Sequence, residues 1–313
     1  MSSSFPLHGI VVPLVTPLAE RDRLDEAGLE LLIEHVIDGG VHGVFLLGTT
    51  GEAPSLSERL KRELIQRVAG QVDRRVSILV RLTDASSVDS VKLARFAAEH
   101  EVDPCVAAPP PYFPLHQGDL TAYMRELAGE SPLPVYLYNM PSHSKVAFGV
   151  ETVRRLADVD QIAGIKDSSG EMLFYNQMLM LAAERREFTV LMGPEELLAE
   201  SVLMGGHGGV CGGANLVPQL YVELYEAAVS GDLTLIHRLQ HRVLRLASRV
   251  YTVGDAPSGY LTGLKCALEC VGLCSARLAE PLTALPADRR SLLVQHLRDL
   301  ELIVDEKTAS PHG

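Results

Sequence analysis

The chain has 313 residues, of which 47% are hydrophobic and 22% are charged, a composition typical of a globular protein with a large buried core. The formal net charge of −12 argues against a surface that binds nucleic acid or an anionic membrane. The first residues, MSSSFPLHG, lack the basic and apolar regions of a signal peptide, and no apolar run approaches the roughly 18 residues of a membrane span. We therefore expect a cytoplasmic protein.

Short apolar runs rich in β-branched residues alternate with longer amphipathic segments along the first 230 residues. We expect eight β-strands, at residues 9–15, 43–48, 76–82, 103–108, 134–139, 162–166, 188–193 and 208–213. The segments between them have apolar residues at helical spacing, as at 25–40, 56–72, 86–100 and 150–159. Strands that alternate with helices pair in parallel, and eight such units in about 230 residues predict an α/β fold of the (β/α)8 TIM-barrel type.

The strand pattern stops after residue 230. Segments 234–253, 260–272 and 287–306 are predicted helices, and their apolar faces require cover from the barrel or from a neighbouring subunit. We therefore divide the chain into a barrel (1–230), C-terminal helices packed on it (231–303) and a flexible tail (304–313).

In such a barrel the chemistry lies at the C-terminal ends of the strands, and the sixth predicted strand ends on a lysine, Lys166. Strand alternation places Lys166 and Gly164 on one face and Ile165 on the other, which points the lysine into the barrel mouth. One interpretation is a structural ion pair, for example with Glu52 or Asp84. The other is an amine kept partly uncharged by loss of solvation, which can attack a ketone and form a Schiff base.

Two further strand ends carry candidate groups. Tyr138 ends the preceding strand, where it is either a neighbour for proton transfer or a packed aromatic residue. In GTTGE, Thr49 and Thr50 lie between glycines whose backbone N–H groups are free to face a carboxylate or phosphate. The same stretch also suits a plain turn before a helix capped by Ser57, and the two interpretations are compatible.

Two patterns raise the question of a metal site. Cys266, Cys270 and Cys274 recur every fourth residue, but they lack the Cys-x-x-Cys spacing of a zinc knuckle, so we interpret them as packed side chains of a helix. Glu195 and Glu196 follow a predicted strand, where acidic residues at the start of a helix are ordinary. We expect no metal ion at either place.

The motifs GTTGE, YNMPS, GIKDSSG, GGVCGGAN and LKCALECVG…PLTAL, in this order, resemble the dihydrodipicolinate synthase/N-acetylneuraminate lyase family over about residues 5–303. The resemblance implies Lys166 as the Schiff-base lysine and Tyr138 as the proton donor and acceptor. It implies Thr49 and Thr50 as ligands of a 2-oxo acid carboxylate, and Val210 as a backbone carbonyl facing the keto acid. It also implies a homotetramer built from dimers and a reaction without metal or organic cofactor.

Two residues depart from the lysine-biosynthesis synthase of this family. His143 stands where the synthase has an arginine, whose permanent charge and bidentate geometry histidine does not match. Phe113 stands where the synthase has a tyrosine that reaches across a dimer interface, so Tyr112 or a water would have to supply the missing hydroxyl. The segment RLTDASS also lacks the asparagine expected for feedback binding of lysine.

These departures favour a lyase (aldolase) that joins or releases pyruvate and an aldehyde, on a sugar acid or a hydroxy-oxo acid. The alternatives are 4-hydroxy-tetrahydrodipicolinate synthase, an imine-forming dehydratase of the same family, and a non-catalytic barrel that binds a keto acid.

Overall fold

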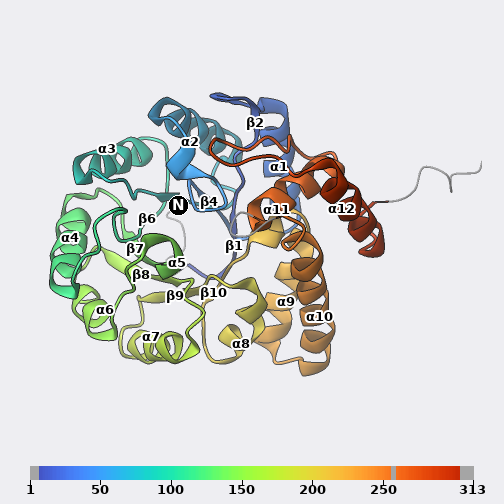
Figure 1. Ribbon diagram of the computed structural model, residues 1–313. Helices are drawn as coiled ribbons and strands as arrows, with labels where there is room; N and C mark the ends of the chain where they lie inside the picture. The colour runs from blue at the N-terminus through green and yellow to red at the C-terminus, as the bar shows by residue number, and fades with distance from the viewer. Residues whose placement is uncertain (1–6, 255–258, 304–313) are drawn as a thin grey trace, which may run out of the picture.

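The computed structural model describes residues 7–254 and 259–303, which form a closed barrel of parallel strands surrounded by helices (Figure 1). The strand order around the barrel is β1-β10-β9-β8-β7-β6-β5-β4, so that strands consecutive in the barrel sequence are neighbours in space. The first strand closes the barrel by pairing in parallel with both β10 and β4. The predicted (β/α)8 barrel is confirmed.

Each predicted strand coincides with a strand of the barrel. These are β1 (Gly9–Pro13), β4 (Gly43–Leu46), β5 (Ser77–Arg81), β6 (Cys105–Ala107), β7 (Val135–Asn139), β8 (Ile162–Asp167), β9 (Thr189–Met192) and β10 (Gly208–Val210). A short antiparallel hairpin, β2 (Leu18–Glu20) and β3 (Arg23–Leu24), follows β1 and was not predicted.

Helices cover the outside of the barrel. They are α1 (Glu26–Asp38), α2 (Glu58–Val72), α3 (Ser87–Ala98), α4 (Gln117–Glu130), α6 (Val150–Leu156), α7 (Met172–Glu184), α8 (Leu198–Leu203) and α9 (Pro218–Ser230). Shorter helical turns follow strand ends, namely η1 (Ala53–Ser55), α5 (Pro141–Ser144), η2 (Glu195–Leu197) and η3 (Gly212–Asn215). As predicted, Ser57 caps α2, because its side chain accepts a hydrogen bond of 3.2 Å from the backbone N–H of Leu60.

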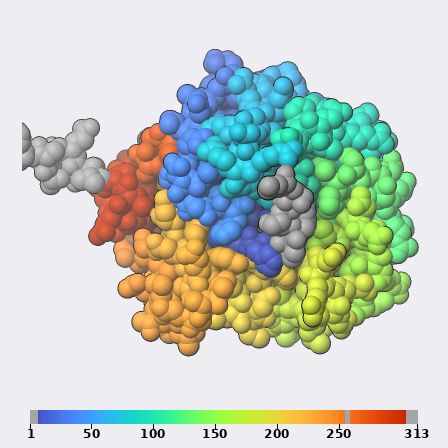
Figure 2. Space-filling view, turned by 180° about the vertical axis from the view of Figure 1, so that it is seen from behind, coloured from blue at the N-terminus to red at the C-terminus, as the bar shows by residue number. Residues whose placement is uncertain are grey.

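Within the part of the chain that the structure describes, three helices follow the barrel: α10 (Leu233–Val250), α11 (Gly259–Cys270) and α12 (Ala287–Asp299). They gather on one flank of the molecule, which Figure 2 shows in orange and red from the side opposite to Figure 1. The helix predicted over 287–306 ends earlier, at Asp299, and the tail predicted over 304–313 lies outside the described residues. No helix among residues 7–254 and 259–303 is long and apolar enough to cross a membrane.

Alternation along the strands separates two layers of apolar residues. One layer fills the space between barrel and helices and includes Ile165, whereas the other fills the barrel interior and includes Tyr136 and Tyr138. Gly164 also faces the interior, where a Cβ atom would lie 2.7 Å from the ring of Tyr136 and 2.3 Å from the carbonyl oxygen of Thr189. Glycine at this position therefore makes room for the aromatic side chain below the barrel mouth.

A buried ion pair joins α11 to the loop after β4. The Nζ atom of Lys265 lies 2.7 Å from Oε1 of Glu52, and both side chains are fully buried. The same amine donates to the carbonyl oxygens of Thr16, at 2.9 Å, and of Arg277. The other carboxylate oxygen of Glu52 accepts a hydrogen bond of 2.7 Å from the backbone N–H of Ala279. Each charge thus has the partners that offset its loss of solvation.

Replacing Lys265 by methionine should lower the free energy of unfolding by about 3–5 kcal/mol, because the Glu52 carboxylate is left buried without its cation. The matched control is Arg155→Met, which breaks an exposed ion pair with Glu151 and should cost less than about 1 kcal/mol. Urea denaturation at a fixed protein concentration measures both. If both variants lose the same free energy of unfolding, the buried ion pair contributes no more to stability than the exposed one.

Candidate active site

A cavity of about 940 Å³ opens at the carboxyl ends of the barrel strands. Its volume is in the range of pockets that enclose a small organic molecule. Residues from five strands and the loops after them line it, among them Thr49, Thr50, Arg81, Tyr138, His143, Lys166 and Val210. The fold thus brings most of the predicted site residues to one place.

Lys166 lies one residue before the end of β8 and points into the mouth of the barrel. Its Nζ atom is 4.1 Å from the ring centroid of Tyr138 and 5.2 Å from that of Phe45, and the residue is 7% exposed. The register of β7 and β8 pairs Tyr138 with Lys166 directly. The geometry therefore sets a buried amine against two aromatic faces.

Lys166 forms no ion pair with either of the partners suggested from the sequence, Glu52 and Asp84. Glu52 is paired with Lys265, and Asp84 lies 3.5 Å from Nζ of Lys61. Among the residues that the structure describes, no carboxylate pairs with Lys166. The structural ion-pair interpretation of this lysine is wrong for both named partners.

The environment of Tyr138 favours its ionised form. Burial raises the pKa of Tyr138, but the positive charge of Lys166, a hydrogen bond with Thr49 and the positive charge of Arg81 outweigh burial, and the net pKa lies below the ordinary value of 10.0. The Tyr138 hydroxyl is 3.3 Å from Oγ1 of Thr49. A readily ionised phenol beside an amine is suited to moving protons.

The loop that carries the two threonines is held from both sides. Oγ1 of Thr50 is 3.1 Å from the hydroxyl of Tyr260 on α11. A Cβ atom at Gly48 would lie 2.9 Å from the ring of Phe45, so glycine is needed for the loop to lie against that ring. The threonine hydroxyls consequently face the same cavity as Lys166.

Glu195 and Glu196 lie in the first turn of η2, as predicted, but Glu195 also has a structural role that the sequence did not indicate. Its buried carboxylate accepts hydrogen bonds of 2.6 Å from the hydroxyls of both Tyr221 and Tyr251, and one of 2.8 Å from the backbone N–H of Gly213. Burial raises the pKa of Glu195 against the opposing effect of these hydrogen bonds. Glu195 therefore ties α9 and the end of α10 to the strand end after β9.

The three cysteines do not share one helical face. Cys266 and Cys270 lie on α11, but this helix ends at Cys270, so Cys274 belongs to the following loop. All are free thiols, of which Cys266 and Cys274 are buried and Cys270 is partly buried. Within residues 7–254 and 259–303, no group of three or more histidine, cysteine, aspartate or glutamate side chains is arranged to hold a metal ion.

Three of the predicted specificity residues differ in their placement. His143 lines the cavity, and burial together with the positive charges of Arg81 and Lys145 lowers its pKa, which favours the neutral imidazole. Tyr112 and Phe113 are 90% and 70% exposed, stack edge to face with their ring centroids 5.0 Å apart, and do not line the cavity of the single chain.

The sequence analysis missed Arg81 as a site residue. Arg81 ends β5 two positions after Leu79, a residue of the barrel interior, so strand alternation directs its side chain inward as well. The signal was therefore the same one that identified Lys166, a basic residue at the carboxyl end of an apolar strand.

A closed parallel barrel with a buried lysine beside a tyrosine at its mouth is an arrangement that suits enzyme chemistry at a lysine amine. Residues 6–300 match the Dihydrodipicolinate synthetase family. The chain belongs to this family, whose members are lyases of the Schiff-base aldolase type, and it is an enzyme of that class.

Known proteins of this family cover nearly the whole chain. An uncharacterised DapA-like lyase of Halobacterium salinarum is 34% identical over 95% of this chain and 95% of its own length. The structure of dihydrodipicolinate synthase from Bacteroides thetaiotaomicron is 45% identical, with a TM-score of 0.92 over 95% of this chain and 99% of that one. YagE, a prophage protein of E. coli K12 solved in complex with pyruvate, is 28% identical, with a TM-score of 0.89 over 95% of this chain and all of its own.

A spectroscopic titration tests the lowered pKa of Tyr138. The chain has nine tyrosines and no tryptophan, so the rise in absorbance near 295 nm reports tyrosinate alone. One tyrosine should ionise below pH 10, whereas burial raises the pKa of residues such as Tyr136, to about 12. The early step should be absent in Tyr138→Phe and should move to higher pH in Lys166→Met, which removes the positive charge. If the absorbance rise below pH 10 persists in Tyr138→Phe, the tyrosine that ionises there is another residue.

Proposed function

We propose that Lys166 forms a Schiff base with pyruvate and that the enzyme joins pyruvate to an aldehyde or releases it from the joined product. The observation that carries this proposal is a lysine that is 7% exposed, whose Nζ atom lies 4.1 Å from the Tyr138 ring centroid and pairs with no carboxylate among the described residues. Support comes from YagE, whose structure holds pyruvate, and from the family's lyase chemistry.

The proposed reaction proceeds through an imine and an enamine formed on Lys166. The uncharged amine of Lys166 attacks the ketone carbon, and loss of water from the carbinolamine gives a protonated imine. The imine draws electrons from the C–H bond of the adjacent carbon, whose proton leaves to form an enamine. The enamine adds to the aldehyde carbon, and water then releases the product and the free lysine. The imine itself is the electron sink, so the proposal includes no metal or organic cofactor.

The neighbouring residues have distinct proposed roles. Tyr138, with its lowered pKa and its contact with Thr49, transfers protons at the carbinolamine and at the hydroxyl formed from the aldehyde. Thr49 and Thr50 orient the carboxylate of the keto acid. Val210, 3% exposed on β10, presents its backbone carbonyl to the bound keto acid.

4-Hydroxy-tetrahydrodipicolinate synthase is a second candidate, favoured by the 45% identity to the Bacteroides thetaiotaomicron synthase. Against it stands His143, whose lowered pKa favours a neutral side chain where the synthase uses an arginine. An imine-forming dehydratase would share every residue above. Product analysis by NMR separates these reactions, because a dehydratase gives a dehydrated oxo acid without cleaving a C–C bond.

We also propose that the enzyme is a homo-oligomer, a tetramer by resemblance. Tyr112 and Phe113 expose two large aromatic side chains next to each other, at 90% and 70% exposure. Exposed aromatic pairs of this kind mark surfaces that a partner covers. A second copy of the chain is the proposed partner.

Borohydride trapping tests the Schiff base. Incubation with pyruvate and sodium borohydride should add one reduced pyruvyl group per chain, and peptide mapping should place it on Lys166. Lys166→Arg should show no adduct, whereas Lys145→Arg, on the exposed surface beside the cavity, should be labelled like the wild type. If Lys166→Ala instead binds pyruvate almost as well as the wild type, and the wild type gives no adduct, the proposed Schiff base at Lys166 is wrong.

Tyr138→Phe should lower kcat by about 10²–10⁴-fold, because the proton-transferring hydroxyl is lost while the ring against Lys166 is kept. The control is Tyr225→Phe, a tyrosine of α9 in contact with His42 and outside the cavity lining, which should retain wild-type kcat. Steady-state kinetics with pyruvate and an aldehyde identified by screening measures both. If kcat for Tyr138→Phe is similar to that of the wild type, Tyr138 does not transfer protons in the reaction.

A further inference from the structure

Arg81 brings a second basic group to the mouth of the barrel. It ends β5, and its side chain lines the same cavity as Tyr138, His143 and Lys166. Its positive charge acts on both Tyr138 and His143, lowering the pKa of each, which places the guanidinium on the side of the cavity formed by β5 to β7.

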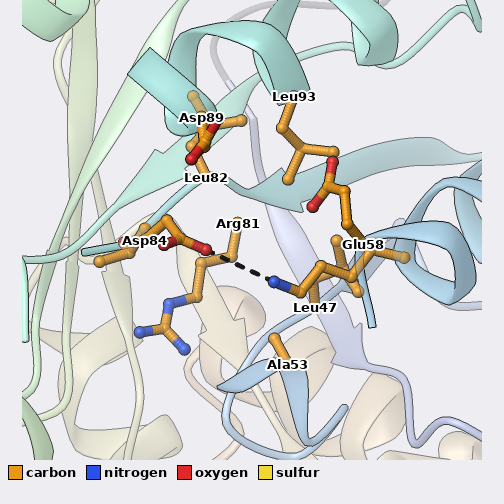
Figure 3. A pocket seen from close by; sticks show the side chains of 10 residues that line it. Leu47, Ala53, Glu58, Arg81, Leu82, Asp84, Asp89 and Leu93 are labelled. Carbon is orange, nitrogen blue, oxygen red and sulfur yellow. Dashed lines mark ion pairs between the residues drawn. The ribbon is translucent and has the colours of Figure 1, made fainter. Parts of the chain in front are cut away.

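The guanidinium makes no hydrogen bond or ion pair with the residues that the structure describes, although the charges of Tyr138 and Asp84 favour its protonated form. Its Nε atom is fully buried and makes no hydrogen bond. The neighbouring carboxylate of Asp84 pairs with Lys61, and Figure 3 shows the guanidinium of Arg81 directed away from that ion pair. Burying a charged donor without an acceptor is costly, and burial accordingly lowers the pKa of Arg81.

The other acidic residues of the cavity wall are not available to Arg81. Glu52 is paired with Lys265, and Glu195 is hydrogen-bonded to two tyrosines. Glu196 follows β9, which lies four strands from β5 in a barrel of eight and therefore on its opposite side. No carboxylate among the described residues pairs with Arg81, and its side chain lines a cavity large enough to hold an anionic ligand.

We propose that Arg81 binds a second anionic group of the substrate, so that the compound built or cleaved on Lys166 carries a carboxylate or a phosphate at the end remote from its keto acid. This inference rests on the proposed Schiff base at Lys166. The planar guanidinium offers paired N–H donors that match the oxygens of either anion. His143 lines the same part of the cavity and, in its favoured neutral form, accepts or donates a hydrogen bond without competing for the anion.

The test compares 2-oxo acids of equal chain length with and without a distal anion. The pairs are 2-oxoglutarate with 2-oxopentanoate, 2-oxoadipate with 2-oxohexanoate, and 2-oxo-3-deoxy-6-phosphogluconate with 2-oxo-3-deoxygluconate. Borohydride trapping at graded ligand concentrations gives the half-saturation concentration for each compound. In the wild type we expect at least one charged member to bind roughly ten- to a hundredfold more tightly than its partner. The pair that discriminates tells whether the anion is a carboxylate or a phosphate.

In Arg81→Met the ratio within the discriminating pair should fall to about one, and in Arg81→Lys, which keeps a cation without the planar fork, it should be intermediate. The control Arg155→Met removes an exposed cation outside the cavity lining and should retain the wild-type ratio. A ratio, unlike a rate, does not change if Arg81 only tunes Tyr138, because that effect acts on both members of a pair.

Three results would overturn the inference, and they are distinguishable. If the wild type is trapped by pyruvate but discriminates within no pair, Arg81 binds no substrate anion. If the wild-type ratio persists in both Arg81 variants, another group holds the anion. If no compound is trapped at all, the proposed Schiff base fails, and this inference fails with it.

Discussion

The buried ion pair between Glu52 and Lys265 is the contact on which the geometry of the barrel mouth depends. Glu52 ends the loop that carries the two threonines, and Lys265 lies on α11, one of the helices added after the barrel. The same helix supplies Tyr260, whose hydroxyl reaches Thr50. Because two fully buried charges are stable only when matched, the C-terminal helices and the ligand-facing loop are held in one relative position.

Two lysines are buried among the described residues, and their environments differ. Lys265 is surrounded by three oxygen acceptors that satisfy an ammonium group. Lys166 lies against aromatic rings, with the readily ionised hydroxyl of Tyr138 nearby. We propose Lys166 as the reactive amine because no carboxylate among the described residues pairs with it, whereas Lys265 is held by Glu52 and two carbonyl oxygens.

Much of the fold was predictable because strand and helix periods are local properties. The eight barrel strands and the inward orientation of Lys166 follow from alternation in short apolar runs. The β2–β3 hairpin was missed because strands of three and two residues carry too little pattern. Arg81 was missed although alternation applies to it equally, since a single arginine at a strand end is ordinary until its neighbours show that it has no partner.

The sequence by itself determined the barrel, the family and the position of Lys166 at the barrel mouth. Periodicity and motif spacing are properties of neighbouring residues in the chain, so they can be read without the tertiary structure. The tertiary structure alone decided the pairing of charges. Glu52 and Lys265 are separated by a long stretch of chain, and no local pattern indicates which of several carboxylates meets which cation. Those pairings leave Lys166 and Arg81 as basic groups facing the cavity without a described carboxylate partner, which is the physical basis for the proposed reaction and its proposed substrates.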